Sequence, residues 1–141
     1  MLVVGRESHE GATKELVQLA SDLGIEQNVK FQGEVPIHSA LDGVDVLLAP
    51  STREGLPGVV IESVSLGVPV VASDIEPMKE VARQLAGVST IPLADEAGWR
   101  QAVQSSLQLN KFEIRESFIG SHFQFERFVS EHRTMWAGGK L

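Results

Sequence analysis

The chain has 141 residues, of which 43% are hydrophobic and 22% charged, an ordinary composition for one globular domain with a sizeable core. Its net charge of −7 argues against a nucleic-acid-binding surface, although a local site for an anionic ligand can still be positive. The absence of cysteine excludes disulfides and thiolate metal sites, and no segment approaches the roughly 20 apolar residues of a membrane span. We therefore expect a single domain over residues 1–141, located in the cytoplasm.

Apolar runs typical of strands alternate with helical periods along the chain. In order, the predicted strands are Leu2–Val4, Val29–Phe31, Val44–Ala49, a run through Val68, Val70 and Val71, and Val88–Leu93. The predicted helices are Glu10–Leu23, Pro36–Leu41, one from Pro57 to just before Gly67, Glu76–Leu85, one capped by Asp95 that runs to about Leu109, Lys111–Ile119 and Phe123–Met135. The first strand has no lead-in, which suggests a fragment of a longer protein.

The strands are continuous apolar runs rather than alternating patterns, which is typical of a parallel sheet buried on both faces. Together with the alternation of strands and helices, this predicts an α/β fold. We expect a doubly wound, Rossmann-like parallel sheet of about five strands, with helices on both faces and further helices at the C-terminus.

The stretch Ser51–Asp74 has the clearest functional pattern. Pro57 suits the first position of a helix, and Gly67 suits the residue that ends it. Glu62 lies one turn beyond Gly58, about 6 Å along the axis, so its carboxylate and the free N–H groups of the helix start share one side. Apolar residues adjoin Glu62 in sequence, which predicts a buried or half-buried carboxylate that needs a partner.

Ligands of doubly wound sheets bind beyond the carboxyl ends of the strands. Three loops occupy that position, Gly5–Glu7, Gly33–Pro36 and Pro50–Gly55. The helix start at Pro57–Gly58 is suited to an anion, and Arg53 could either neutralise a phosphate or lie on the surface. None of the four histidines pairs at a spacing typical of a metal site.

Several motifs together resemble the group 1 glycosyltransferases. The main one is E-G-L-P-G-V-V-I-E (54–62) followed by S-V-S-L-G-V-P-V-V-A-S-D (63–74). In the family's order come also L-V-V-G (2–5), V-K-F-Q-G-E-V-P (29–36), D-V-L-L-A-P-S (45–51) and F-Q-F-E-R (123–127). The resemblance covers nearly the whole chain and implies the C-terminal, donor-binding domain of a retaining, nucleotide-sugar-dependent enzyme of GT-B fold.

The resemblance also implies a role for each site residue. Glu54, the expected catalytic residue, would lie beside the hydroxyls of the donor sugar, and Glu62 would accept hydrogen bonds from the ribose. The loop Gly33–Val35 would lie by the nucleobase. The donor would be a nucleoside diphosphate sugar, and no cofactor or metal is expected. The remaining donor-binding residues are Arg53 and the loop residues Gly55, Leu56, Gly58 and Val59, together with Gly33 and Val35.

The chain departs from the family pattern in ways that carry structural expectations. Pro57 stands where many relatives have glycine. The family's Arg and Lys that grip the pyrophosphate follow a strand that precedes Leu2, and the acceptor-binding N-terminal domain also lies outside the chain. That absent strand would lie between the first and third strands. Either these two pair directly, giving the order 2-1-3-4-5, or another chain fills the gap.

The expected reaction is transfer of a sugar to a glycan, lipid or small-molecule acceptor, with little activity from this chain alone. A non-catalytic nucleotide-binding or interaction module that partners a separate N-terminal subunit is the alternative. A nucleotide-sugar 2-epimerase shares the two-domain fold but fits the Glu54–Glu62 motif less well. Peripheral attachment of the parent enzyme to the inner face of the membrane and assembly into a homo-oligomer are left open. No nucleic-acid partner is expected.

Overall fold

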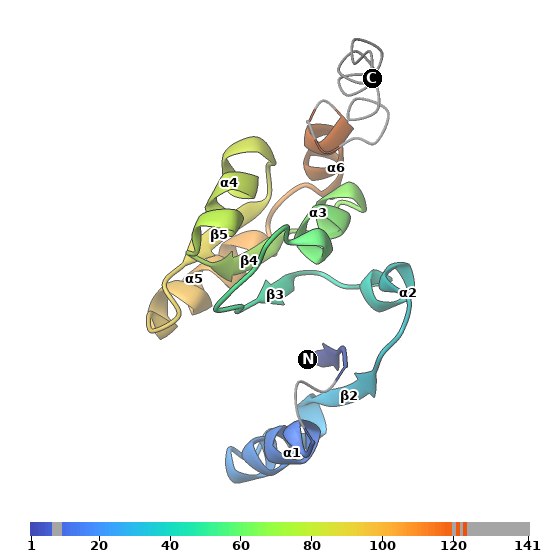
Figure 1. The fold of residues 1–141 in the computed structure, drawn as a ribbon, viewed down its shortest axis with the longest axis vertical. Helices are drawn as coiled ribbons and strands as arrows, with labels where there is room; N and C mark the ends of the chain where they lie inside the picture. The colour runs from blue at the N-terminus through green and yellow to red at the C-terminus, as the bar shows by residue number, and fades with distance from the viewer. Residues whose placement is uncertain (7–9, 120, 122, 124–141) are drawn as a thin grey trace, which may run out of the picture. The chain divides into compact units, whose positions relative to one another are not determined.

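A computed structural model describes residues 1–6, 10–119, 121 and 123, and its ribbon is drawn in Figure 1. The chain divides into two compact units, Met1–Asp42 and Gly43–Leu141, and each is described by itself. That the two units make up one domain stays a prediction. The helix expected over residues 123–135 lies outside the described residues, apart from Phe123.

The first unit is a βαβ arrangement. Its two strands pair in parallel, with Leu2 opposite Lys30 and Val3 opposite Phe31, and α1 provides the crossover. A short 3-10 helix, η1, precedes the second strand and was not predicted from the sequence. The elements are β1 (Leu2–Val4), α1 (Ala12–Asp22), η1 (Glu26–Asn28), β2 (Lys30–Gly33) and α2 (Ile37–Leu41).

The second unit contains a parallel sheet of three strands in the order β3-β4-β5. Helices join successive strands, as the alternating sequence pattern predicts. Figure 1 shows α3 and α6 side by side, and the two helices contact each other. The elements are β3 (Leu47–Ala49), α3 (Gly58–Ser65), β4 (Val70–Ser73), α4 (Glu76–Gln84), β5 (Val88–Ile91), α5 (Glu96–Ser106) and α6 (Lys111–Ile119).

The core of this unit surrounds β4, whose four residues are all buried. Side chains alternate along a strand, so Val70 and Ala72 share one face, where they join a cluster of residues from α3, α4 and α6. Val71 points to the other face, on the side where α5 contacts β4. Helices therefore cover both faces of the central strand, as expected. The buried cluster consists of Ala49, Val60, Val64, Val70, Ala72, Met78, Val81, Leu85 and Ile114.

The strands form two sheets, β1-β2 and β3-β4-β5, rather than one sheet of five. The neighbours predicted within each group are confirmed. Of the two arrangements that were expected for the first and third strands, direct pairing is not formed. The resemblance implies a further strand between these two. Such a strand would pair with β1 along one of its edges and with β3 along the other. Without it, β1 and β3 are each the edge strand of their own sheet.

In the first unit α1 and the residue that ends it carry an apolar stripe, Leu16, Val17, Leu19, Ala20 and Leu23, which is largely uncovered. Only Ala20 of that stripe is buried, whereas Leu16, Val17, Leu19 and Leu23 are exposed. A two-stranded sheet with three- and four-residue strands offers too little surface to cover a helix of 11 residues.

In the described part of the chain, no helix combines the length and apolarity that crossing a membrane requires.

Candidate functional site

The loop from Pro50 to Pro57 follows β3 and leads into α3 at the carboxyl end of the three-stranded sheet. Pro57 is buried and is the residue just before the helix. The helix therefore begins at Gly58, one residue later than predicted. Its carbonyl oxygen accepts hydrogen bonds from the N–H groups of Val60 (3.0 Å) and Ile61 (3.3 Å). No side chain in the described ranges caps α3, so its start relies on backbone groups alone.

The backbone N–H groups around this helix start differ in whether they already donate a hydrogen bond within the protein. The Gly58 N–H donates to the Leu56 carbonyl at 2.8 Å, so the fold already uses a donor that the sequence assigned to a ligand. The Val59 N–H meets no acceptor among the described residues, and neither do those of Gly55 and Leu56. Free amides at a helix N-terminus, together with the helix dipole, favour an anion such as a phosphate.

Glu54 is half-buried and held by a hydrogen bond within its own loop. Its Oε1 accepts from the Ser51 hydroxyl at 2.7 Å, and the Ser73 hydroxyl donates to the Ser51 carbonyl oxygen. Neither serine is among the site residues predicted from the sequence. The signal that could have found them is their place at the carboxyl ends of two adjacent parallel strands, with Ser51 three residues before the acid.

Glu62 is exposed, so the prediction of a buried or half-buried carboxylate is wrong. Val60 and Val64 are four residues apart, lie on one helix face and are fully buried. Glu62 lies two residues from each of them, which is about 200° around the helix and therefore on the opposite side. Neighbours in sequence are not neighbours on a helix surface. The carboxylate is consequently available to a ligand without any buried partner.

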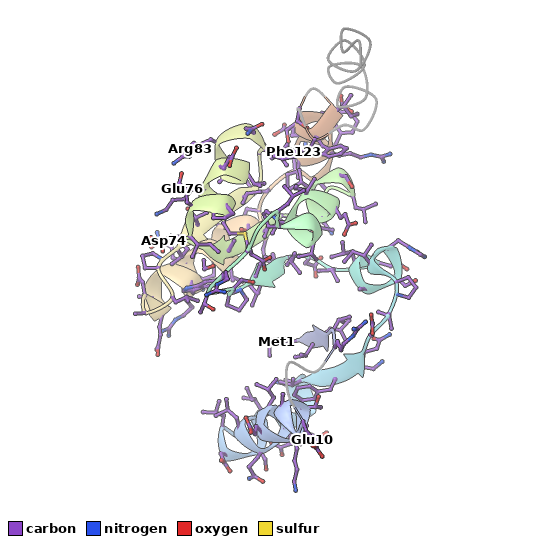
Figure 2. The ribbon with its side chains drawn as sticks, viewed as in Figure 1. Met1, Glu10, Asp74, Glu76, Arg83 and Phe123 are labelled. Carbon is purple, nitrogen blue, oxygen red and sulfur yellow. The ribbon has the colours of Figure 1, made fainter. Side chains whose placement is uncertain are left out.

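Three cations of this unit, Arg53, Lys79 and Arg83, differ in whether a carboxylate pairs with them. Lys79 Nζ lies 3.4 Å from a carboxylate oxygen of Asp74, and Arg83 lies 2.8 Å from Glu76. Figure 2 shows Glu76 and Arg83 on the same side of α4. Arg53 is exposed and forms no ion pair with any residue that the structure describes. Of these three, Arg53 is therefore the cation whose charge is left for an anionic ligand.

Gly33 and Val35 belong to the first unit. Gly33 ends β2 with a φ of +72°, a conformation that favours glycine. Glu34 between them accepts two hydrogen bonds from Arg6, at 3.0 and 3.2 Å, which join the loops after β1 and β2. Gly33 also lines a pocket of about 250 Å³ in this unit, together with Gly5 and Arg6.

Within the described ranges, no three His, Asp or Glu side chains gather where they could hold a metal ion. That the donor binds without a metal stays a prediction.

The chain matches the family model described as "Glycosyl transferases group 1" over residues 1–108. It is 30% identical over 119 residues to the lipopolysaccharide core biosynthesis glycosyltransferase LpsE of Rhizobium meliloti (strain 1021), covering 79% of this chain and 34% of that protein. It is 29% identical over 126 residues to the phosphatidyl-myo-inositol mannosyltransferase of Mycobacterium leprae (strain TN), covering 86% and 31%. The chain thus spans about a third of the length of these curated relatives.

A solved structure resembles the fold. The crystal structure of AviGT4, a glycosyltransferase involved in avilamycin A biosynthesis, matches with a TM-score of 0.68 over 98% of this chain and 43% of that one, at 18% identity. The match confirms the α/β, Rossmann-like architecture of GT-B enzymes. With the family model covering most of its length, the chain belongs to the group 1 glycosyltransferases.

Proposed function

We propose that this chain binds the donor of a retaining glycosyltransferase, a nucleoside diphosphate sugar, whose sugar the whole enzyme transfers to an acceptor. One observation carries the proposal. Between β3 and α3, unsatisfied backbone amides lie in the segment between two carboxylates, at the carboxyl end of a parallel sheet. A phosphate suits the amides, and carboxylates suit the hydroxyl groups of the sugar and the ribose.

Each residue then has the role that the resemblance implies. The exposed Glu62 accepts hydrogen bonds from the ribose, and Glu54 does the same for the donor sugar as the catalytic residue. The free amides of the loop and of Val59 bind the phosphates, with Arg53 as a nearby cation. That the Gly33–Val35 loop, which belongs to the first unit, lies by the nucleobase stays a prediction from the resemblance.

The chemistry requires stabilisation of the leaving group. As the bond between the anomeric carbon and the phosphate oxygen breaks, negative charge gathers on the departing nucleoside diphosphate. The positive end of α3 and its free amides stabilise that charge more than the charge of the intact donor, which lowers the barrier. Because these donors are fixed by the backbone, they need no metal ion to act.

The names of the two curated relatives support a proposal for the class of acceptor. One is named for lipopolysaccharide core biosynthesis and the other for phosphatidyl-myo-inositol mannosylation. A glycan or lipid acceptor is therefore favoured over a small molecule for the enzyme to which this chain contributes.

The test is a calorimetric titration of the chain with nucleoside diphosphates. Glu62→Ala should weaken binding at least tenfold, because hydrogen bonds to a charged group contribute about 1.5–3 kcal/mol and tenfold is about 1.4 kcal/mol. Glu116→Ala is the matched control, since Glu116 is also an exposed helical glutamate. Glu116 adjoins Ser117, whose hydroxyl accepts a hydrogen bond from the Ala86 N–H. Ala86 lies just before β5, at the amino end of the strand and so at the end of the sheet away from the proposed site.

Two results would contradict the proposal in different ways. If no nucleoside diphosphate binds the wild-type chain at millimolar concentration, the chain has no donor site. If nucleotides bind but Glu62→Ala and Glu116→Ala behave alike, the site exists but Glu62 does not hold the ribose.

A further inference from the structure

A series of two hydrogen bonds that share Ser51 connects Glu54 to the central strand. It begins at Ser73, the last residue of β4, which is completely buried. The Ser73 hydroxyl donates to the carbonyl oxygen of Ser51. These residues meet because β3 and β4 pair in parallel, with Ala49 opposite Ala72, so that the chain leaving β3 passes the end of β4.

The second step runs from Ser51 to Glu54. The half-buried Ser51 uses its hydroxyl proton in the 2.7 Å hydrogen bond to Oε1 of Glu54. A hydroxyl has one proton, so both serines are fully used as donors and the direction of the series is fixed. The other carboxylate oxygen, Oε2, meets no donor among the described residues, and it remains able to accept from a ligand.

The rest of the loop does not hold this side chain. The residues around Glu54, Thr52 to Leu56, are otherwise exposed, and Gly55 follows it directly. A glutamate in such a loop samples many rotamers, and fixing it only when the ligand arrives costs conformational entropy. A hydrogen bond anchored on a buried strand removes that cost before binding.

We propose that Ser51 and Ser73 are positioning residues, which hold the Glu54 carboxylate so that Oε2 accepts from a hydroxyl of the donor sugar. The inference rests on the proposed function and adds the source of selectivity for the sugar. Only a ligand that carries the sugar gains from the series. The bare nucleoside diphosphate, held by the α3 start and Glu62, gains nothing.

The experiment compares ligands with and without the sugar on the 141-residue chain. The pairs are UDP with UDP-glucose, GDP with GDP-mannose, ADP with ADP-glucose, and dTDP with dTDP-glucose, each titrated by calorimetry. For the pair that binds the wild type, Ser51→Ala should weaken the sugar nucleotide about tenfold, as loss of a hydrogen bond to a charged group does. The bare nucleotide should change less than twofold.

Ser51→Thr keeps the hydroxyl and should restore binding of the sugar nucleotide. Ser73→Ala, one step further away, should act in the same direction with a smaller loss. The matched control is Ser117→Ala. Ser117 is also half-buried and makes two hydrogen bonds, from the Ala86 N–H at 3.1 Å and to the Ile114 carbonyl at 2.6 Å, so its loss should affect neither ligand.

A purely structural role predicts a different pattern. The inference is overturned if Ser51→Ala weakens both ligands equally, if it weakens neither, or if Ser117→Ala has the same effect. Should Ser51→Ala not fold, Ser51→Cys gives the same comparison, because a thiol fills similar space but donates weakly. A wild-type chain that binds no ligand of the panel overturns the donor site itself, and the inference with it.

Discussion

At the scale of single residues, Ser106 is a buried polar residue whose hydroxyl makes no hydrogen bond to any described residue. It ends α5, is 2% exposed, and its hydroxyl meets no hydrogen-bond partner in the part of the chain that the structure describes. Burying an unpaired hydroxyl costs about 1–3 kcal/mol. We expect Ser106→Ala to raise the free energy of unfolding by about 1 kcal/mol, measured by urea denaturation.

Its neighbour Ser105 is the matched control, because it is exposed on the same helix. Ser105→Ala gains only the helix propensity of alanine, about 0.5 kcal/mol or less. Equal effects from the two substitutions would show that the Ser106 hydroxyl is satisfied in solution.

The residue types of the site followed from the sequence, but their surroundings did not. The resemblance to the group 1 motif names Glu54 and Glu62, and the place of Glu62 one turn beyond Gly58 points to it as well. Their roles stay predictions. The exposure of Glu62 follows from the helical period, which sets it opposite Val60 and Val64, and was missed by reading sequence neighbours as spatial ones. Ser73 lies 22 positions beyond Ser51, and their contact depends on strand pairing that no local pattern encodes.

At the scale of elements, the join between α3 and β4 depends on Gly67. The Gly67 N–H donates to the Val64 carbonyl and the Val68 N–H to the Ser63 carbonyl, which is the Schellman arrangement of a helix end. Gly67 has a φ of +80°, and a Cβ there would lie 2.6 Å from the Lys111 carbonyl oxygen. Gly67→Ala should therefore cost at least about 2 kcal/mol, from the strained conformation and the clash.

The measurement is the urea midpoint, with an unchanged slope as the sign that only stability has moved. Gly58→Ala, at the other end of the same helix, is the control, since its Cβ would meet nothing within 4 Å and its φ is not positive. A midpoint for Gly67→Ala that matches the Gly58→Ala midpoint would contradict the role of Gly67.

Element boundaries were predicted well where the chain signals them and poorly where tertiary contacts set them. Lys111–Ile119 and Leu2–Val4 have the bounds that were predicted. The third strand begins at Leu47 rather than Val44. Lys111 Nζ donates a hydrogen bond to the Val44 carbonyl oxygen at 3.1 Å, and the hydrogen bonds to β4 begin where the Leu47 N–H donates to the Pro69 carbonyl oxygen. Val68, counted in the fourth strand, instead completes the end of α3.

At the scale of the whole molecule, fold class could be predicted but sheet continuity could not. Apolar strand runs separated by helices require parallel strands with crossovers, and both sheets have them. Whether β1 and β3 pair depends on which strand edges face each other, and this is a property of the assembled fold. Three-residue strands carry no pattern that selects one neighbour over another.

The last prediction concerns the activity of the 141 residues on their own. Transfer needs an acceptor hydroxyl beside the anomeric carbon and enough positive charge to stabilise the leaving pyrophosphate. The chain spans 34% and 31% of its two curated relatives, and in the second unit Lys79 and Arg83 already pair with carboxylates. We therefore expect these residues to bind a donor but transfer little or no sugar.

The measurement is release of nucleoside diphosphate from a sugar nucleotide, with and without a glycan or lipid acceptor. The same preparation is titrated with that sugar nucleotide, so that the absence of turnover is read only where binding is present. Binding without turnover would mean that acceptor positioning and further charge come from outside these residues. Robust transfer by the chain alone would instead require Arg53 and the α3 start to supply all the charge stabilisation that the reaction needs.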